Sequence, residues 1–504
     1  MADAKRLAKN TLLMYVRMIL IMVVSIYTSR VVLDKLGIDD YGLYNAVGSI
    51  VAMINFLNVT LSTSTSRFLA YDIGHGDEVK LQKTFSTSFY CHLLLAIIIV
   101  ILLETIGLWY MGDRFVIPEG RERAVRIVFH ISVLTAFIGV LQVPYTASII
   151  AHENMDIYAY VGIVDVFLRL GIVYLLTFTH FDKLIVYASL IAIVHFLVFL
   201  SYYVASRYKY PETKITKSFS PDTFKGMMGF TGWTAIANFS NTMVVQGAIV
   251  LLNLFFSPAI IAAKALANQI TNAVMQFVNN FRVALNPQII KSYAAEEIDE
   301  FKKWSLRSTV ISSDLMLVLG LPCIASAKTI LNLWLVEVPP LAIEFTQLAI
   351  LSQIIGSISS STYIPFVAAG KLKLNAIWGA ITGVGYFLAL YLFFKLGAGA
   401  LWVQWLYLAL MLLSVLWLRP WLLHKEIGFT YAEIYRCIWD CFKPLIFAGL
   451  LSVGLMYLFS DSLYHQVILF VLVFILSCTV VWFCLEHTIR TYITTMFKLK
   501  LLRK

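Results

Sequence analysis

The stretch "QVPYTASIIAHEN" (142–154) recurs in outline as "YIPFVAAGKLKLN" (363–375), at an offset of 221 residues. The triplet around Pro144 aligns with the triplet around Pro365, and Asn154 aligns with Asn375. At the same offset "NFLN" (55–58) aligns with "QFVN" (276–279), and no gap is needed between the matches. Matches on one register indicate an internal duplication, as found in many transporters.

The duplicated segments are strongly apolar. Of the 504 residues, 60% are hydrophobic and only 13% are charged, with a mean hydropathy of +0.80, whereas a soluble domain carries roughly 25% charged residues. A transmembrane helix needs about 20 apolar residues. By this criterion the sequence predicts an all-α polytopic membrane protein with fourteen transmembrane helices, at about 7–33, 40–66, 85–110, 124–150, 158–179, 183–206, 226–256, 259–290, 304–333, 341–370, 374–396, 399–423, 441–460 and 464–487.

The repeat divides these spans into two lobes. Residues 1–206 form the expected N-lobe with six spans, 207–225 a polar cytoplasmic linker, and 226–423 the C-lobe with six more. Because six is an even number, both copies enter the membrane in the same orientation, which gives two parallel lobes. Residues 424–504 hold two extra helices and a cytoplasmic tail.

The basic residues orient the chain. With the amino terminus inside, 26 of the 39 Lys and Arg lie in cytoplasmic segments, 8 lie outside and 5 lie within spans or at their edges. Cytoplasmic loops are the basic ones in membrane proteins, so both termini are expected in the cytoplasm. The net charge of +10 has the same origin and does not indicate nucleic-acid binding.

The sequence argues against an enzyme. The longest connections, about 111–123 and 207–225, are too short to hold a soluble domain, and the chain has no GxxxxGK, HExxH or zinc-ligand spacing. The six cysteines lack metal spacing and are interpreted as ordinary small apolar residues. We therefore expect neither a catalytic site nor a metal site.

Polar residues form stripes on several spans. In 259–290 they recur every three or four residues, so they share one helix face, and they are Lys264, Asn268, Asn272, Asn279, Arg282 and Asn286. The span at 226–256 carries Asn238 and Gln246 on a similar stripe. Lipid cannot satisfy so many donors and acceptors, so these faces must meet water or protein. Simple adhesion between helices remains the alternative explanation.

The intramembrane cations require a further explanation. Arg17, Lys264 and Arg282 lie within spans, where a charge needs an anionic partner or water. Acids are few there; Asp165 is spaced to pair with Arg169 four residues on, which leaves a cationic surplus. We interpret the surplus as a central hydrated cavity that fits a phosphorylated glycan headgroup, since guanidinium groups bind phosphate with paired donors. Local pairing of each cation inside the bundle is the alternative.

Pro144 and Pro365 occupy matching positions near the cytoplasmic ends of two spans. Proline removes an amide donor and clashes with the preceding turn, so both helices are expected to kink. The kinks would act as hinges for opening and closing, or would only shape the packing.

Four motifs carry a family resemblance. They are "YGLYNAV" (41–47), "TSRFLA" (65–70), "VPYTASIIAHENMDIYAYV" (143–161) and "NPQIIKSYA" (286–294). Together with the 6 + 6 + 2 layout they resemble the Wzx-type polysaccharide, or O-antigen, flippases. These belong to the multidrug/oligosaccharidyl-lipid/polysaccharide (MOP) superfamily, which also holds the MATE drug exporters and the lipid II flippases.

The resemblance implies a function. Such proteins move undecaprenyl-pyrophosphate-linked oligosaccharide across the bacterial inner membrane by alternating access, without a cofactor and with possible H⁺ or Na⁺ coupling. Their cavity cations meet the pyrophosphate, which makes Arg17, Arg30, Lys264 and Arg282 the candidates here by position. Asp165, Asp314 and Glu104 are the candidates for ion coupling. Partners would be the lipid-linked glycan, membrane lipid and other polysaccharide assembly proteins. A MATE-type cation-coupled exporter of drugs or metabolites is the alternative. Such exporters typically bind organic cations and favour acidic or aromatic cavities.

Overall fold

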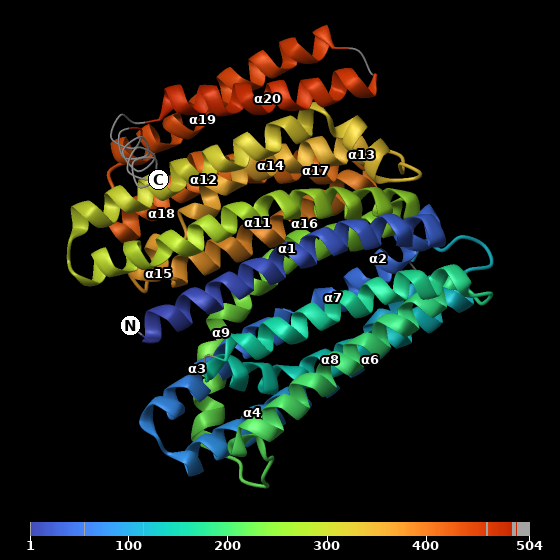
Figure 1. The fold of residues 1–504 in the computed structure, drawn as a ribbon, viewed down its shortest axis with the longest axis vertical. Helices are drawn as coiled ribbons and strands as arrows, with labels where there is room; N and C mark the ends of the chain where they lie inside the picture. Colours follow the sequence, from blue (N-terminus) through green and yellow to red (C-terminus); the bar gives the residue numbers. More distant parts are fainter. Residues whose placement is uncertain are drawn as a thin grey trace. The chain divides into compact units, whose positions relative to one another are not determined.

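The computed structural model describes residues 2–54, 56–113, 115–152, 154–459, 462–485 and 490. Side chains are described from Met18 onward, except at 59, 63, 113, 155, 230–234, 236–237 and 283–284. Within these ranges the chain forms helices and no strand, as Figure 1 shows. This agrees with the all-α prediction, because a helix satisfies every backbone donor and acceptor within one segment in a bilayer.

The helices follow the apolar runs. The first ten are α1 (Ala2–Leu36), α2 (Ile38–Ile54), α3 (Phe56–His75), α4 (Glu78–Leu102), α5 (Leu108–Asp113), α6 (Glu122–Ala151), α7 (Met155–Phe178), α8 (Lys183–Lys209), α9 (Pro221–Thr242) and α10 (Ala248–Phe255). The others are α11 (Pro258–Ala294), α12 (Ile298–Ala325), α13 (Ala327–Trp334), α14 (Ala342–Ser361), α15 (Ile364–Ala368), α16 (Lys373–Lys395), α17 (Trp402–Leu413), α18 (Arg419–Leu422), α19 (Tyr431–Leu458) and α20 (Leu463–Cys484). Short π-helical turns at Leu103–Gly107, Met243–Gly247, Ser414–Leu418 and Leu423–Ile427 interrupt three of the spans, since the last two turns lie in the same span.

Twelve helical stretches in the described part of the chain are long and apolar enough to cross a membrane. The protein is therefore a multi-pass membrane protein. Helices α1 and α11 occupy the first and eighth expected spans but are not among the twelve. The polar stripe of α11 lowers the hydropathy of that helix. The number of fourteen spans and the cytoplasmic position of both termini remain predictions.

Short polar side chains fix several helix starts. Asp77 accepts from the amide of Lys80 before α4, and Thr430 forms a capping box with Glu433 before α19. Asp182 accepts from the amides of Leu184 and Ile185 at the start of α8. Such caps satisfy amides that have no partner within the helix, so the polar residues between the apolar runs set where each span begins.

The described contacts divide the chain into two compact units. Unit 1 holds residues 1–265, 335–339 and 376–400, and unit 2 holds 266–334, 340–375 and 401–504. Helix pairs that correspond at the offset of 221 pack together in each unit: α4 with α6 and α6 with α8 in unit 1, and α12 with α14 and α14 with α17 in unit 2. The expected lobes 1–206 and 226–423 remain a prediction.

In unit 1, α9 and α16 pack closely. Ser240 on α9 donates a hydrogen bond to the carbonyl of Gly379 on α16, and a side-chain carbon added at Gly383 would lie 2.2 Å from Ser240 Oγ. A glycine is required where two helix backbones approach so closely. Similarly, a carbon added at Gly42 on α2 would lie 1.9 Å from the carbonyl oxygen of Pro258.

The expected linker is bound to unit 1 through most of its length. Residues 207–209 end α8 and 221–225 begin α9, and the segment 210–220 between them, here termed the strap, hydrogen-bonds to α4. Tyr90 Oη donates to the carbonyl of Thr216 (3.1 Å), and the amide of Ser220 donates to Thr87 Oγ1 (3.0 Å). At the other end of the strap, His152 Nε2 lies 2.6 Å from Glu212 Oε1. These contacts hold the strap against the helices of unit 1.

Arg121 joins three helix starts in unit 1. Its guanidinium donates to Asp40 on α2 (Nε to Oδ1, 2.9 Å) and to Asp182 at the start of α8 (Nη1 to Oδ2, 2.6 Å), while Arg121 itself precedes α6. Burial works to raise the pKa of Asp182, but the hydrogen bonds from Arg121 and two helix amides outweigh it and hold this pKa below its usual value.

In unit 2, α12 lies at the centre and packs against α14, α19 and α20. The apolar core includes Leu317, Ile354, Ala448 and Val473, each at most 1% exposed. Burying a leucine, isoleucine or valine side chain contributes about 1.5–3 kcal/mol relative to leaving it exposed. The two C-terminal helices are thus packed onto unit 2 and share its core.

The two repeat prolines lie in different local structures. Pro144 is buried inside the continuous helix α6, whereas Pro365 is in the first turn of α15, after α14 has ended at Ser361. Proline is tolerated in a first helical turn because its missing amide would have no partner there. The aromatic residues that follow are buried alike, Tyr145 at 1% and Phe366 at 0% exposure. The proposed hinge role remains a prediction.

Candidate functional site

Helix α11 exposes a row of amide side chains in unit 2. Asn272, Gln276 and Asn279 are exposed, and Asn268 is half-buried. Their spacings of four, four and three residues place them on one helix face. Hydrocarbon offers amides no hydrogen-bond partners, so this face requires water, other protein or a polar ligand.

Arg282 lies at the end of this row and is 8% exposed. Its Nη2 donates to the carbonyl of Ser357 on α14 (2.9 Å), and Nη1 makes a long contact of 3.5 Å to Asn279 Oδ1. Its Nε is buried without a hydrogen-bond partner. No carboxylate pairs with Arg282 in the described part of the chain. Its positive charge is therefore buried against neutral groups.

Lys264, on the part of α11 that belongs to unit 1, is also 8% exposed. It forms no ion pair with any described acid, while nearby helix residues such as Ala263 and Ala267 are fully buried. A buried ammonium without a carboxylate is costly, so Lys264 resembles Arg282 in being an unbalanced cation.

The other expected site residues differ in their surroundings. Arg30 is exposed on α1 and has an interaction partner, while the side chain of Arg17 lies outside the described residues. Asn238 on α9 donates to Thr60 Oγ1 on α3 (2.9 Å), a bond that joins two helices of unit 1. Gln246 is half-buried in a π-helical turn. Asn238 therefore already fits the alternative explanation of helix adhesion.

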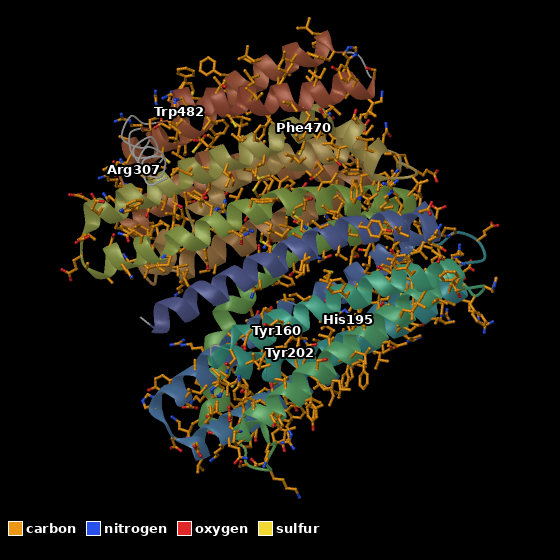
Figure 2. The ribbon with its side chains drawn as sticks, in the orientation of Figure 1. Tyr160, His195, Tyr202, Arg307, Phe470 and Trp482 are labelled. Atoms are coloured by element: carbon orange, nitrogen blue, oxygen red, sulfur yellow. The ribbon has the colours of Figure 1, made fainter. Side chains whose placement is uncertain are left out.

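Two of the three candidate acids are paired. Asp165 Oδ1 accepts from Arg169 Nε on α7 (2.9 Å), as the spacing indicates, and Arg169 Nη2 also donates to His195 Nε2 on α8 (3.3 Å). Figure 2 labels His195. Glu104 Oε1 lies 2.9 Å from His130 Nδ1. Sequence reasoning missed His195 and His130 as partners, because each is 26 residues away along the chain.

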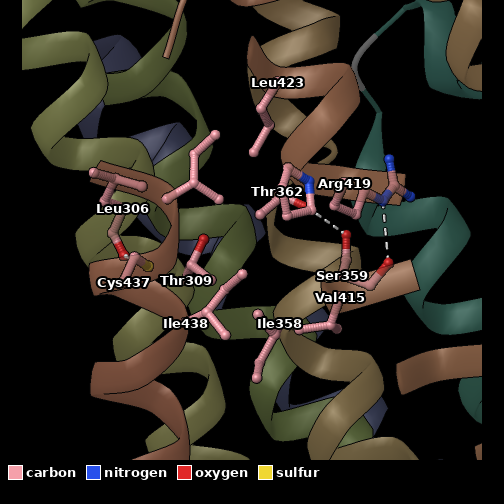
Figure 3. Close-up of a pocket in the computed structure, with 12 residues that line it drawn as sticks. Leu306, Thr309, Ile358, Ser359, Thr362, Val415, Arg419, Leu423, Cys437 and Ile438 are labelled. Atoms are coloured by element: carbon pink, nitrogen blue, oxygen red, sulfur yellow. Dashed lines mark hydrogen bonds between the residues drawn. The ribbon is translucent and has the colours of Figure 1, made fainter. Parts of the chain in front are cut away.

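Arg419 is a polar residue that the sequence analysis did not single out. It was counted with the cytoplasmic cations, although the apolar stretch "LLSVLWLRPWLLH" (412–424) around it is a signal of burial. Its Nε donates to Ser359 Oγ on α14 (3.1 Å), its Nη1 donates to Asn375, and its guanidinium lies 6.0 Å from the ring centre of Phe366. Figure 3 shows Arg419 facing Ser359.

A small hollow in unit 2 lies beside Arg419. Its volume is about 10 Å³, and Thr309, Ile358, Val415 and Ile438 are among the residues that line it. This volume holds a single water, so the hollow is too small for a lipid headgroup. Ser357 and Ser359 are two positions apart on α14, roughly 200° around the helix. Arg282 and Arg419 therefore reach different sides of α14 and do not form one site.

The geometry supplies groups that can bind a ligand. Arg282 and Lys264 each carry a charge that described protein groups leave unbalanced. The side chains of Asn272 and Gln276 on α11 are exposed, and Asn279 is exposed beside its long contact with Arg282. Anions and hydroxyl-rich ligands are the chemistry that such groups bind. A shared chamber lined by these residues remains a prediction.

The fold has close relatives among solved structures. The lipid II flippase MurJ in an inward closed conformation superposes with a TM-score of 0.68 at 12% identity, over 94% of this chain and 99% of that chain. The chain has the fold of the MOP superfamily transporters. A MOP superfamily transporter from Pyrococcus furiosus matches with a TM-score of 0.58 at 16% identity (83% and 96% coverage), and a MATE transporter, VcmN of Vibrio cholerae, with 0.54 at 18% (85% and 98%).

Sequence comparison adds nothing to the MOP fold assignment: no family model matches this chain, and no curated protein matches it. At identities of 12–18% the similarity establishes the fold alone. The resemblance to Wzx-type flippases is finer than this assignment and belongs to the proposed function.

Proposed function

We propose that the chain is a flippase that moves an undecaprenyl-pyrophosphate-linked oligosaccharide across the bacterial inner membrane by alternating access. The observation that carries the proposal is Arg282, a guanidinium 8% exposed with only neutral partners and an unsatisfied Nε. A buried donor without an acceptor costs about 1–3 kcal/mol. A phosphate oxygen supplies both the missing acceptor and the missing negative charge.

The neighbouring groups suit the rest of the headgroup. Asn272, Gln276 and Asn279 continue from Arg282 along α11, and their amides both donate and accept hydrogen bonds, as sugar hydroxyls require. Lys264 adds a second buried cation. The polyprenyl chain stays in lipid during the cycle, and only the headgroup passes along the polar face. The similarity of fold to a lipid II flippase supports a lipid-linked substrate.

Charge pairing drives recognition in this mechanism. Removing phosphates from water costs several kcal/mol per charge, and the cations offset this cost only when they are already held in place. The hydrogen bond from Arg282 to the Ser357 carbonyl holds the guanidinium on α14 before the substrate arrives. Arg17 and Arg30 on α1 are the remaining candidates for phosphate contact.

The experiment is export of surface glycan in a strain that lacks this gene, complemented with the wild type, Arg282→Ala or Arg17→Ala. The same variants are then reconstituted in liposomes with undecaprenyl pyrophosphate carrying a short fluorescent oligosaccharide. We expect a loss of glycan export and of flipping in both variants at unchanged protein levels. Full export in both variants would contradict the proposal.

A MATE-type exporter of organic cations is the second candidate, because MATE transporters share the fold. The net basic character of the buried groups on α11 argues against it. Efflux of cationic dyes that depends on expression of this chain would favour the exporter over the flippase.

A further inference from the structure

The three acids proposed for ion coupling differ in whether a described side chain pairs with them. Asp165 is paired with Arg169, and Glu104 is paired with His130. Asp314 forms no ion pair with any described residue, and its Oδ1 is buried without a hydrogen-bond partner. Of these three acids, Asp314 is therefore the one whose negative charge the described residues leave unbalanced.

Asp314 lies in the interior of unit 2. It is on α12, 5% exposed, about 24 Å along the helix from Ile298 at 1.5 Å per residue. Its helix neighbours Met316 and Leu317 belong to the apolar core that α12 shares with α14, α19 and α20. A carboxyl group in this position has lost the hydration that would stabilise its charge.

Within the part of the chain that the structure describes, no cation is found to act on Asp314. Asp440 on α19 is the charged side chain that acts on Asp314, and the two repel each other. Lys443 is engaged by Asp440 at 2.8 Å. Cys441 on α19 contacts Ser313, and Cys484 ends α20, where Asp314, Asp440, Lys443 and Arg490 all act on its thiol. On α14 the acidic side chain is Glu344, in the first turn of that helix.

Burial and the repulsion from Asp440 both disfavour the charged form of Asp314. An isolated carboxylate is very costly in a low-dielectric interior, and in practice such a group takes up a proton instead. A second acid nearby increases this preference. A protonated carboxyl group is neutral and adds a hydroxyl donor, which makes it compatible with the core between α12 and α19.

We propose that Asp314 is a proton-binding site of this chain, and that release of its proton couples transport to the proton gradient. One proton binds to the carboxylate to give the neutral acid while the interface of α12 and α19 is closed, and leaves to water when that interface is hydrated. The coupling role rests on the proposed flippase function, whereas the binding of a proton does not. In this proposal the C-terminal helices α19 and α20 take part in coupling transport to the proton gradient.

The first experiment detects the proton directly. Infrared spectra of the purified chain in liposomes, recorded through a pH titration, report the carbonyl stretch of protonated carboxyl groups. We expect such a band at neutral pH in the wild type, loss of that band in Asp314→Asn, and retention in the controls Glu104→Gln and Asp165→Asn. No such band in the wild type, or a band undiminished in Asp314→Asn, would overturn the proposal.

A second variant covers the case that Asp314→Asn does not fold. Asp440 is 34% exposed in its side chain, so Asp440→Asn is expected to fold. Without the repulsion from Asp440, the proton on Asp314 is held less tightly, and the band should disappear at a lower pH than in the wild type. An unchanged titration in Asp440→Asn would argue against the site.

The coupling role is tested with the fluorescent lipid-linked oligosaccharide in liposomes. We expect a proton gradient to accelerate flipping by the wild type and to have no effect on Asp314→Asn. Flipping driven by a sodium gradient alone would overturn proton coupling and leave the flippase function intact. If the wild type does not flip the lipid although the infrared band is present, the proposed function fails while the proton site stands.

Discussion

Arg282 Nη2 on α11 donates a hydrogen bond to the carbonyl oxygen of Ser357 on α14, at 2.9 Å, and this acceptor carries no net charge. The acceptor lies near the end of α14, where helix carbonyls carry partial negative charge. A helix end balances only part of a full positive charge, so Arg282 is positioned by α14 but is not neutralised by it.

Substitution of Arg282 should affect transport more than folding. Arg282→Lys keeps the charge but loses the planar pair of donors, so we expect partial activity. Arg282→Ala should reduce the flipping rate by about 10- to 100-fold, because a charge-assisted hydrogen bond contributes about 1.5–3 kcal/mol. The measurement is initial flipping rate in liposomes. Lys303→Ala is the matched control, because Lys303 is exposed and pairs locally with Glu300. Equal rates for all three variants would contradict the role of Arg282.

Gly42 should tolerate no side chain. A carbon added there lies 1.9 Å from the carbonyl oxygen of Pro258, whereas one added at Gly48 on the same helix meets nothing within 4 Å. Gly42→Ala should destabilise the protein by about 1–3 kcal/mol, as overpacking does, and Gly48→Ala should be neutral or stabilising. Thermal unfolding in detergent measures both, and similar melting temperatures for the two variants would show that α2 can move away from Pro258.

Arg419 should stabilise unit 2. Arg419→Ala removes the donor to Asn375 and leaves Ser359 Oγ with Ser414 as its hydrogen-bond partner. We expect a loss of about 1–3 kcal/mol in the free energy of unfolding. Lys425→Ala is the control, since the contact of Lys425 among the described residues is with the ring of Trp421, whose centre lies 4.9 Å away. The measurement is denaturant unfolding monitored by tryptophan fluorescence. If Arg419 does not stabilise unit 2, Arg419→Ala and Lys425→Ala should have the same free energy of unfolding.

The ion pair of Asp182 with Arg121 should lose stability in acid. Because the pKa of Asp182 is lower in the folded chain than its usual value of 3.8, its contribution to stability is present above that value. This contribution is lost as the pH falls through the lower, folded value. Asp182→Asn keeps a helix cap and removes the charge. The variant should be less stable than the wild type near neutral pH, and the difference should shrink below about pH 4. A difference that is independent of pH would contradict this assignment.

The spans were predictable because each transmembrane helix needs about 20 mainly apolar residues, and such runs can be found in the sequence itself. The expected spans 183–206 and 374–396 agree closely with α8 (Lys183–Lys209) and α16 (Lys373–Lys395). The ion pair of Asp165 and Arg169 was also predictable, because a spacing of four residues fixes it within one helix.

Other contacts could not be predicted because they join distant parts of the sequence. The partners of Arg419 lie 60 and 44 residues away, and Thr216 is 126 residues from Tyr90. The apolar stretch around Arg419 indicates its burial but does not show which residues it contacts. Asp314 was recognised as an acid within a span, but its lack of a partner depends on where α19 and α20 pack.

The strap has a consequence for biosynthesis. Its partners on α4 and α6, among them Ser86, Thr87 and Tyr90, together with His152 directly after α6, precede it in the chain. When the ribosome has made residue 220, every one of them has already been synthesised. The strap can therefore dock as soon as it emerges, and the start of α9 is delivered to α3 before α11 has been translated.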